Sequence, residues 1–241
     1  MSFPLRWVLL FCAVQSMLLA EEWKIVYLAS FPRSGNHWVR FLVEEATHIA
    51  TSSSYRDSDF PHLKHMFPWG GYCPRHGYGG HCRYPTKEDP ILLKTHFPFL
   101  AKRKIDPALK PVICLIRHPI DAFWSFYIYK GGNEARKIKK EKLREFIQRW
   151  RSFYEFWEKK SEVLFIRYED LQENTTFYLS HILQTAGFSF HQMDIERAAA
   201  KYPSQGKPLK HISCYDAEAI EMIKTELSEI LTRFNYQELM P

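Results

Sequence analysis

A short loop near the start of the chain combines residue types that bind anions. The apolar segment 25–29 predicts a buried strand, and the pattern of 39–46 predicts an amphipathic helix soon after it. Between them, Gly35 lets the backbone come close to an anion, while Arg33 and Ser34 offer side-chain donors. The first N–H groups of a helix have no partner within it and lie at its positive end, so this junction predicts a phosphate site. The alternative is that Ser34 only caps the helix.

The loop differs from two common nucleotide-binding sequences. A Walker A loop has four residues between its glycines and a Lys-Ser or Lys-Thr pair, and the dinucleotide fingerprint has three glycines. Here there is one glycine and no lysine after it. These differences argue against a P-loop-like nucleotide kinase or NTPase, which stays as an alternative hypothesis.

A second predicted strand, 111–116, also ends in a cationic residue. Arg117 follows it directly, and Pro119 can open the next helix. Ser125 then lies about two turns into that helix. Both Arg117 and Ser125 could reach one phosphate beside the sheet.

A third predicted strand, 91–93, leads into Lys94 and then His96. In a parallel sheet, ligands bind beyond the carboxyl ends of the strands. The three strand ends therefore predict one shared site that is rich in cations.

Four segments in this order resemble the sulfotransferases that use 3′-phosphoadenosine-5′-phosphosulfate (PAPS). Residues 31–38 resemble the 5′-phosphosulfate loop of that family, and 94–98 resemble its Lys-Thr-His segment. The stretch 117–125 resembles its 3′-phosphate motif, and 163–171 is similar to its later strand and Tyr-Glu-Asp turn. The resemblance implies an α/β, P-loop-NTPase-like three-layer fold with a central, mainly parallel sheet flanked by helices.

The family implies in-line transfer of a sulfuryl group from PAPS to an acceptor hydroxyl or amine, with no metal required. His96 would be the general base, Arg33 would stabilise charge on the leaving phosphate, and Lys94 would steady the transferred group. The acceptor would be a carbohydrate or a small hydroxyl compound. The remaining cofactor contacts implied are Ser34, Gly35, Asn36, His37 and Trp38 at the 5′-phosphate, Arg117 and Ser125 at the 3′-phosphate, Tyr168 at the adenine and Lys207 as a stand-in for a late lid.

The sequence departs from the family pattern at the first loop. Many members have Lys where Arg33 stands, and Thr-Thr where Asn36 and His37 stand. Arg keeps the positive charge but does not readily give up a proton, so its help to the leaving group is electrostatic. A carboxylate base is an alternative to His96, and a binding protein without turnover is a third hypothesis for the whole chain. The carboxylate candidates are Glu44, Glu45, Asp57 and Asp59.

Length and charge fit one domain that binds anions. The chain has 241 residues and a formal net charge of +6, which suits a single α/β domain over 21–241 and an anionic cofactor or acidic acceptor. No zinc-finger, RNP or basic-zipper pattern is present, so nucleic acid is not an expected partner. The long irregular stretch 51–89 predicts a binding loop, which the resemblance implies would line the acceptor pocket, or a loop folded over its own aromatic side chains. The aromatic candidates are Tyr55, His65, Phe67, Trp69 and Tyr72.

The first twenty residues read as a secretory signal peptide with a cleavage position at Ala20. The apolar run is shorter than a membrane-spanning helix of about 20 residues, so no stable span is expected after cleavage. The expected location is the secretory pathway or outside the cell, with the cytoplasm as the alternative. For an exported protein, Cys73 and Cys82 are the expected disulfide pair. The alternatives are free thiols and, last, a zinc site with His76 and His81, whose spacing fits no structural zinc pattern well.

Residues 135–160 predict a long charged helix or a pair of helices, with an apolar stripe that faces the core. The basic cluster 136–140 is either a solvated face or a surface that attracts a sulfated or phosphorylated polymer. A final helix is predicted over 217–234.

Overall fold

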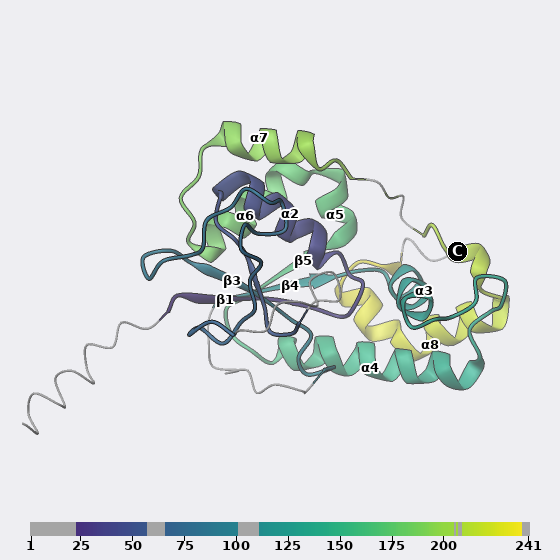
Figure 1. Ribbon diagram of the computed structural model, residues 1–241. Helices are drawn as coiled ribbons and strands as arrows, with labels where there is room; N and C mark the ends of the chain where they lie inside the picture. Colours follow the sequence, from purple (N-terminus) through teal and green to yellow (C-terminus); the bar gives the residue numbers. More distant parts are fainter. Residues whose placement is uncertain (1–22, 57–65, 101–110, 205, 207–208, 238–241) are drawn as a thin grey trace, which may run out of the picture.

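The described part of the chain, residues 23–56, 66–100, 111–204, 206 and 209–237 of a computed structural model, contains a five-stranded sheet (Figure 1). The strand order is β2-β3-β1-β4-β5, and all neighbouring strands are parallel. Their carboxyl ends therefore meet at one edge of the sheet. The strands are β1 (Ile25–Ser30), β2 (Ser52–Ser53), β3 (Ile91–Thr95), β4 (Val112–Ile116) and β5 (Val163–Arg167).

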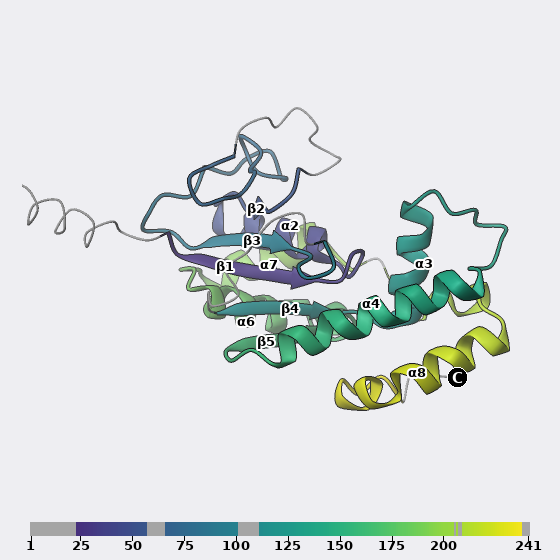
Figure 2. The same cartoon turned by 90° about the horizontal axis from the view of Figure 1, so that it is seen from below.

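Helices cover both faces of this sheet. The helices α2, α6 and α7 lie on one face, and α4 and α8 lie on the other (Figure 1). Figure 2 shows α4 running across the sheet with α8 beside it. The helical segments are α2 (Asn36–Thr47), α3 (Pro119–Tyr129), α4 (Lys140–Glu158), α5 (Tyr168–Glu173), α6 (Thr175–Ala186), α7 (Gln192–Lys201), the 3-10 turn η1 (Ile212–Cys214) and α8 (Ala217–Arg233).

Alternate residues of each central strand enter two different hydrophobic cores. In β1, Val26 and Leu28 pack with the layer of α2 and α6, whereas Tyr27 and Ala29 pack with the layer of α4 and α8. Since both faces of the sheet are covered, the strand is a continuous apolar run. The predicted α/β fold with a parallel sheet between helices is confirmed.

Two predicted helices have different bounds in the structure. The segment expected over 135–160 is helical only from Lys140 to Glu158, and the final helix ends at Arg233. Residues 137–139, just before α4, are not helical, and Ile138 among them is buried in the core. Within the described residues, no helix has the length and apolarity needed to cross a membrane. The expected signal peptide, 1–20, lies outside the described residues.

The described part of the predicted acceptor loop forms a third, smaller core. Trp69, Cys73 and Cys82 are buried there. Both cysteines are free thiols, so the disulfide expected for an exported protein is not formed. Cys73 Sγ donates to the Pro74 carbonyl at 3.5 Å and Cys82 Sγ to the Glu44 carbonyl at 3.6 Å, and burial raises the pKa of each thiol to about 12. The thiols therefore act as small packed side chains.

Candidate active site

The loop between β1 and α2 has the backbone geometry of an anion site. Arg33 and Gly35 both have positive φ, 67° and 96°, and Gly35 is the N-cap of α2. The first hydrogen bond of the helix runs from the Val39 N–H to the Gly35 carbonyl at 3.2 Å. The N–H groups of the first turn thus have no partner inside the helix, and they lie at its positive end.

Tyr168, at the start of α5, covers this loop. A Cβ atom on Gly35 would lie 2.3 Å from Cδ2 of the Tyr168 ring, so glycine is required here for space as well as for φ. The Arg117 guanidinium lies 4.8 Å from the centre of the same ring, and the Trp38 ring meets its edge at 5.7 Å. Burial raises the pKa of the Tyr168 hydroxyl. Tyr168 therefore joins the ends of β1, β4 and β5 in one place.

Arg117 and Ser125 lie beside the same loop. Arg117 follows β4, and its Nη1 donates to the Arg33 carbonyl at 2.9 Å. The Arg33 side chain reaches across to α3, where its Nε donates to Ser125 Oγ at 3.1 Å. The two predicted anion-binding segments, one after β1 and one after β4, are thus in direct contact.

Lys94 lies on the other side of the loop. It is in β3, with only 6% of its surface exposed, and its Nζ is 3.3 Å from Nε2 of His37 on α2. A third positive charge is therefore held beside the start of α2.

His96 follows β3 and has a defined orientation. Its Nδ1 lies 2.6 Å from the Ser30 carbonyl, which can only accept a hydrogen bond. Nδ1 must then carry the proton, and Nε2 of the neutral ring carries the lone pair. The Tyr55 ring stacks on the imidazole, with ring centres 5.8 Å apart. The Tyr55 hydroxyl accepts a hydrogen bond from the backbone N–H of His96 at 3.3 Å and donates one to the Leu100 carbonyl at 2.9 Å. His96 thus has the tautomer that a general base needs.

A cavity of about 710 Å³ connects these residues. Ser34 is fully buried beneath the loop and does not line the cavity, and Lys207 lies outside the described residues. The predicted site residues that line it are Arg33, Gly35, Asn36, His37, Trp38, Lys94, His96, Arg117, Ser125 and Tyr168.

The cavity has further lining residues that the sequence did not single out. Tyr129 and Lys130 follow Ser125 by about one turn of α3, a spacing that could have indicated a shared face. Arg56 is also part of the wall, and no sequence signal pointed to it.

The aromatic side chains proposed for acceptor binding divide into two groups. Tyr55 and Tyr72 line the cavity. Phe67 and Trp69 instead stack on each other, with ring centres 4.5 Å apart, and His65 lies outside the described residues. Part of the loop therefore lines the cavity and part packs on itself, and its role in acceptor binding stays a prediction.

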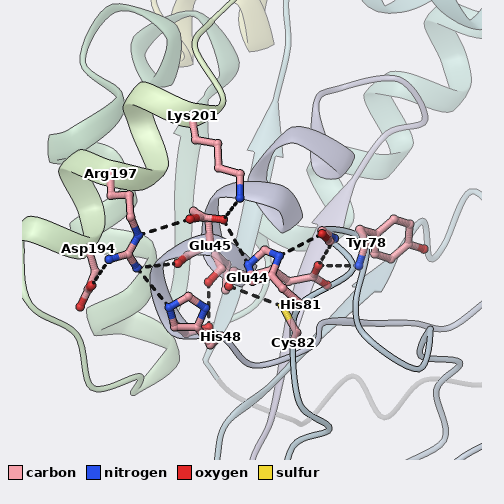
Figure 3. A network of polar contacts seen from close by, with 12 residues as sticks. Glu44, Glu45, His48, Tyr78, His81, Cys82, Asp194, Arg197 and Lys201 are labelled. Carbon is pink, nitrogen blue, oxygen red and sulfur yellow. Dashed lines mark hydrogen bonds and ion pairs between the residues drawn. The ribbon is translucent and has the colours of Figure 1, made fainter.

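Glu44, a candidate carboxylate base, is a structural anchor. Its Oε1 accepts from the Thr51 N–H at 2.9 Å, and its Oε2 accepts from the N–H groups of Tyr78 and Gly79 at 2.5 and 3.1 Å (Figure 3). Burial raises the pKa of Glu44 despite these bonds. Glu44 does not line the cavity, and it fastens the loop at Tyr78 and Gly79 to α2.

Glu45, the next candidate, fastens α7 to α2. It accepts from Lys201 at 2.7 Å and from Arg197 at 3.3 Å, and His81 lies 3.1 Å from it (Figure 3). Burial opposes the ionisation of Glu45, but the hydrogen bonds and charges of its partners, those of Lys201 above all, outweigh burial and lower its pKa. The other two candidates, Asp57 and Asp59, lie outside the described residues.

No group of three or more His, Cys, Asp or Glu side chains in the described ranges could hold a metal ion. The cavity offers cations, backbone N–H groups and one oriented histidine. This set suits binding and transfer of an anionic group.

Comparisons with known proteins agree with this chemistry. A family model described as "Sulfotransferase domain" matches residues 24–203. Sulfotransferase 6B1 of Mus musculus is 28% identical over 186 residues, which are 71% of this chain and 57% of that protein. Cytosolic sulfotransferase 13 of Arabidopsis thaliana is 26% identical over 194 residues, or 71% and 56%. The chain therefore spans a little over half the length of these curated relatives.

Solved structures share the fold at low sequence identity. Mouse sulfotransferase SULT7A1 complexed with PAP has a TM-score of 0.57 and 17% identity, over 91% of this chain and 87% of that one. Retinol dehydratase, in complex with androsterone and the inactive cofactor PAP, has a TM-score of 0.57 and 15% identity, over 86% and 80%. These likenesses support the predicted fold class.

Proposed function

This chain belongs to the sulfotransferase domain family, and from that premise we propose that it transfers a sulfuryl group from PAPS to an acceptor hydroxyl or amine. The observation that carries the proposal is the single cavity that contains the start of α2, Arg117, Ser125 and His96. Such a transfer needs two anion-binding segments to hold the cofactor and a base, here a histidine, to accept the proton of the acceptor.

The residues present fit the cofactor. Arg117 Nε and Asn36 Oδ1 are buried and have no hydrogen-bond partner within the described residues. A buried polar atom without a partner costs free energy, so a ligand that bonds to it is favoured. The 3′-phosphate would lie at Arg117 and Ser125, and the 5′-phosphate at the N–H groups of α2. Tyr168 would contact the adenine, and Lys207, which lies outside the described residues, is the further 3′-phosphate contact that the family resemblance implies.

When bound, PAPS would supply the sulfuryl group, and its nucleotide would be the leaving group that keeps the electron pair of the bridging S–O bond. His96 Nε2 takes the proton from the acceptor, because Nδ1 is already bonded to the Ser30 carbonyl. Arg33 stabilises the charge that develops on the leaving phosphate, and Lys94 steadies the transferred group. The Nε–H of Arg33 donates to Ser125 Oγ, so the N–H groups of Nη1 and Nη2 would be its donors to the phosphate.

The first test is nucleotide binding without Mg²⁺, measured by calorimetry. We expect adenosine 3′,5′-bisphosphate to bind more tightly than ADP, and Arg117→Ala to lose most of this preference. Arg144→Ala, an exposed arginine of α4 outside the cavity, is the matched control. Mg²⁺-dependent ATP binding with no preference for the 3′-phosphate would instead support a nucleotide kinase or NTPase.

The second test is transfer of radiolabelled sulfate from PAPS onto a panel of carbohydrate and small hydroxyl acceptors. Turnover by the wild type and loss of turnover in His96→Ala, with adenosine bisphosphate binding intact, is the expected result. Binding without turnover on the whole panel would favour a non-catalytic relative.

We also propose that residues 1–20 are a cleaved signal peptide, supported by the apolar run that ends at Ala20. Expression in a secreting eukaryotic cell, followed by sequencing of the N-terminus, tests this. A mature protein that starts at Glu21 is expected, and retention of Met1 in the cytosol would refute the proposal.

A further inference from the structure

A second cavity lies directly beside the candidate active site. It has a volume of about 650 Å³ and is enclosed by the end of α3, the connection 130–139, the first half of α4 and Phe99. Six cationic side chains line it, against the single carboxylate of Glu145. The cations are Lys130, Arg136, Lys137, Lys139, Lys142 and Arg149.

The positive charge of this cavity is only partly neutralised. Glu145 accepts from Lys142 at 2.7 Å and from Arg149 at 2.8 Å. Within the part of the chain that the structure describes, no carboxylate comes within 4.0 Å of Lys130, Arg136 or Lys139. Several cations along one concave wall concentrate the field there and raise the local concentration of anions.

The wall that carries these cations is fixed, unlike an ordinary solvated charge run. The Gly131 N–H donates to the Ile128 carbonyl and the Gly132 N–H to the Tyr127 carbonyl, both at 2.9 Å. The Gly132 backbone packs so closely on Tyr127 that an added Cβ would be 2.6 Å from its ring. At the other end of the connection, Ile138 is buried in the core. The connection is thus anchored at both ends.

Three of the cations also lie over aromatic rings. Lys142 lies 5.1 Å from the ring centre of Phe146, and Lys130 lies 5.6 Å from that of Phe126. The Arg149 guanidinium is 5.2 Å from the ring centre of Phe99. Such contacts hold the charged heads near the cavity and reduce their freedom.

The two cavities lie side by side and share part of their wall. Phe126 and Lys130 line both of them. Phe126 directly follows Ser125, and Lys130 is the residue at the end of α3. A long molecule whose reacting group lies near His96 would reach the second cavity across this shared wall.

We propose that the acceptor is an acidic glycan, with its reacting hydroxyl or amine at His96 and the carboxylate or sulfate groups of adjacent sugars in the second cavity. This inference rests on the proposed function, because it identifies the acceptor of that reaction. Extended peptides are commonly bound by an unpaired strand edge, but here the walls are two helices and the connection 130–139, and none of the described strands lines the cavity. Recognition therefore falls to the side-chain cations, which suits a polymer with anionic groups on successive units.

The test is binding of a heparin-derived hexasaccharide, without PAPS, measured by calorimetry at two salt concentrations. The variant Arg136→Ala/Lys139→Ala removes two cations of the cavity, and Arg144→Ala/Lys159→Ala removes two exposed cations outside it. Roughly a two- to fivefold loss per exposed cation predicts about a tenfold weaker Kd for the first variant and little change for the control. Added salt should weaken wild-type binding more than binding by the first variant.

Neutral maltohexaose and a hexaglutamate peptide serve as comparison ligands in the same assay. The proposal expects neither to approach the affinity of the hexasaccharide. Equal loss in both double variants, no hexasaccharide binding, or a hexaglutamate affinity equal to that of the hexasaccharide would each overturn it. Adenosine 3′,5′-bisphosphate is titrated into every variant in parallel. Normal nucleotide binding with no hexasaccharide binding refutes only this inference, whereas loss of nucleotide binding by the wild type refutes the proposed function.

Discussion

Replacement of Gly35 by alanine tests how the start of α2 is built. Two separate costs are expected from the structure. The φ of 96° is unfavourable for alanine by about 1 kcal/mol. In addition, the new Cβ would lie 2.3 and 2.4 Å from two carbons of the Tyr168 ring, well inside the usual carbon–carbon contact of about 3.5 Å.

The ring of Tyr168 must therefore move, and overpacking of this kind costs roughly 1–3 kcal/mol. Gly35→Ala should then lower the free energy of unfolding by about 2–4 kcal/mol in total. Because the same ring contacts the Arg117 guanidinium at 4.8 Å, its displacement should also weaken binding of adenosine 3′,5′-bisphosphate by about tenfold.

Urea unfolding of a double-mutant cycle separates the two costs. In a Tyr168→Ala background the steric cost is absent, so Gly35→Ala should cost only the backbone share of about 1 kcal/mol. The coupling between the two sites is then about 1–3 kcal/mol. Strict additivity of the two substitutions would show that the ring does not restrict residue 35, and the packing argument would be wrong.

Three further outcomes are expected. Burial lowers the pKa of His118 to about 4, so between pH 6.5 and 4 the unfolded chain binds a proton that the folded chain does not. The free energy of unfolding should therefore fall by up to about 3 kcal/mol as the pH drops through this window. Urea midpoints of the wild type and of His118→Asn check this, and parallel pH curves for the two proteins would contradict it. His96→Asn keeps a side-chain N–H for the Ser30 carbonyl but removes the base, so kcat should fall by about 10²–10⁴ with nucleotide affinity unchanged, and an intact rate would transfer the base role to a carboxylate. Glu44→Gln replaces one acceptor oxygen by a donor, so it should lower the free energy of unfolding by about 1–3 kcal/mol and speed amide hydrogen exchange at Tyr78. The control is Glu145→Gln, which changes a carboxylate of a solvent-facing ion pair. Equal effects of the two substitutions would argue against an anchoring role for Glu44.

The positions of the main anion-binding residues follow from local sequence. Gly35, Arg117 and Tyr168 each stand just beyond an apolar strand, and a parallel sheet brings such strand ends to one edge whatever the details of its packing. The chain could therefore reveal the fold class, the family and most of the residues around the first cavity. It could not reveal that Ser34 is buried and faces away from the cavity, although it lies in the same loop, next to Arg33 with its left-handed backbone conformation.

Contacts between distant segments were decided only by the tertiary structure. The Ser30 carbonyl that fixes the His96 tautomer is 66 residues away, and it reaches the imidazole only because β3 pairs with β1. The same holds for Glu44, whose role as an anchor depends on the loop at Tyr78, and for the cysteine pair, whose thiols bond to different carbonyls. Residue type and strand ends set the chemistry available to this protein, because they are local. Strand order and the folding of loops set which of those groups meet, because the pairing partner of each group lies far along the chain.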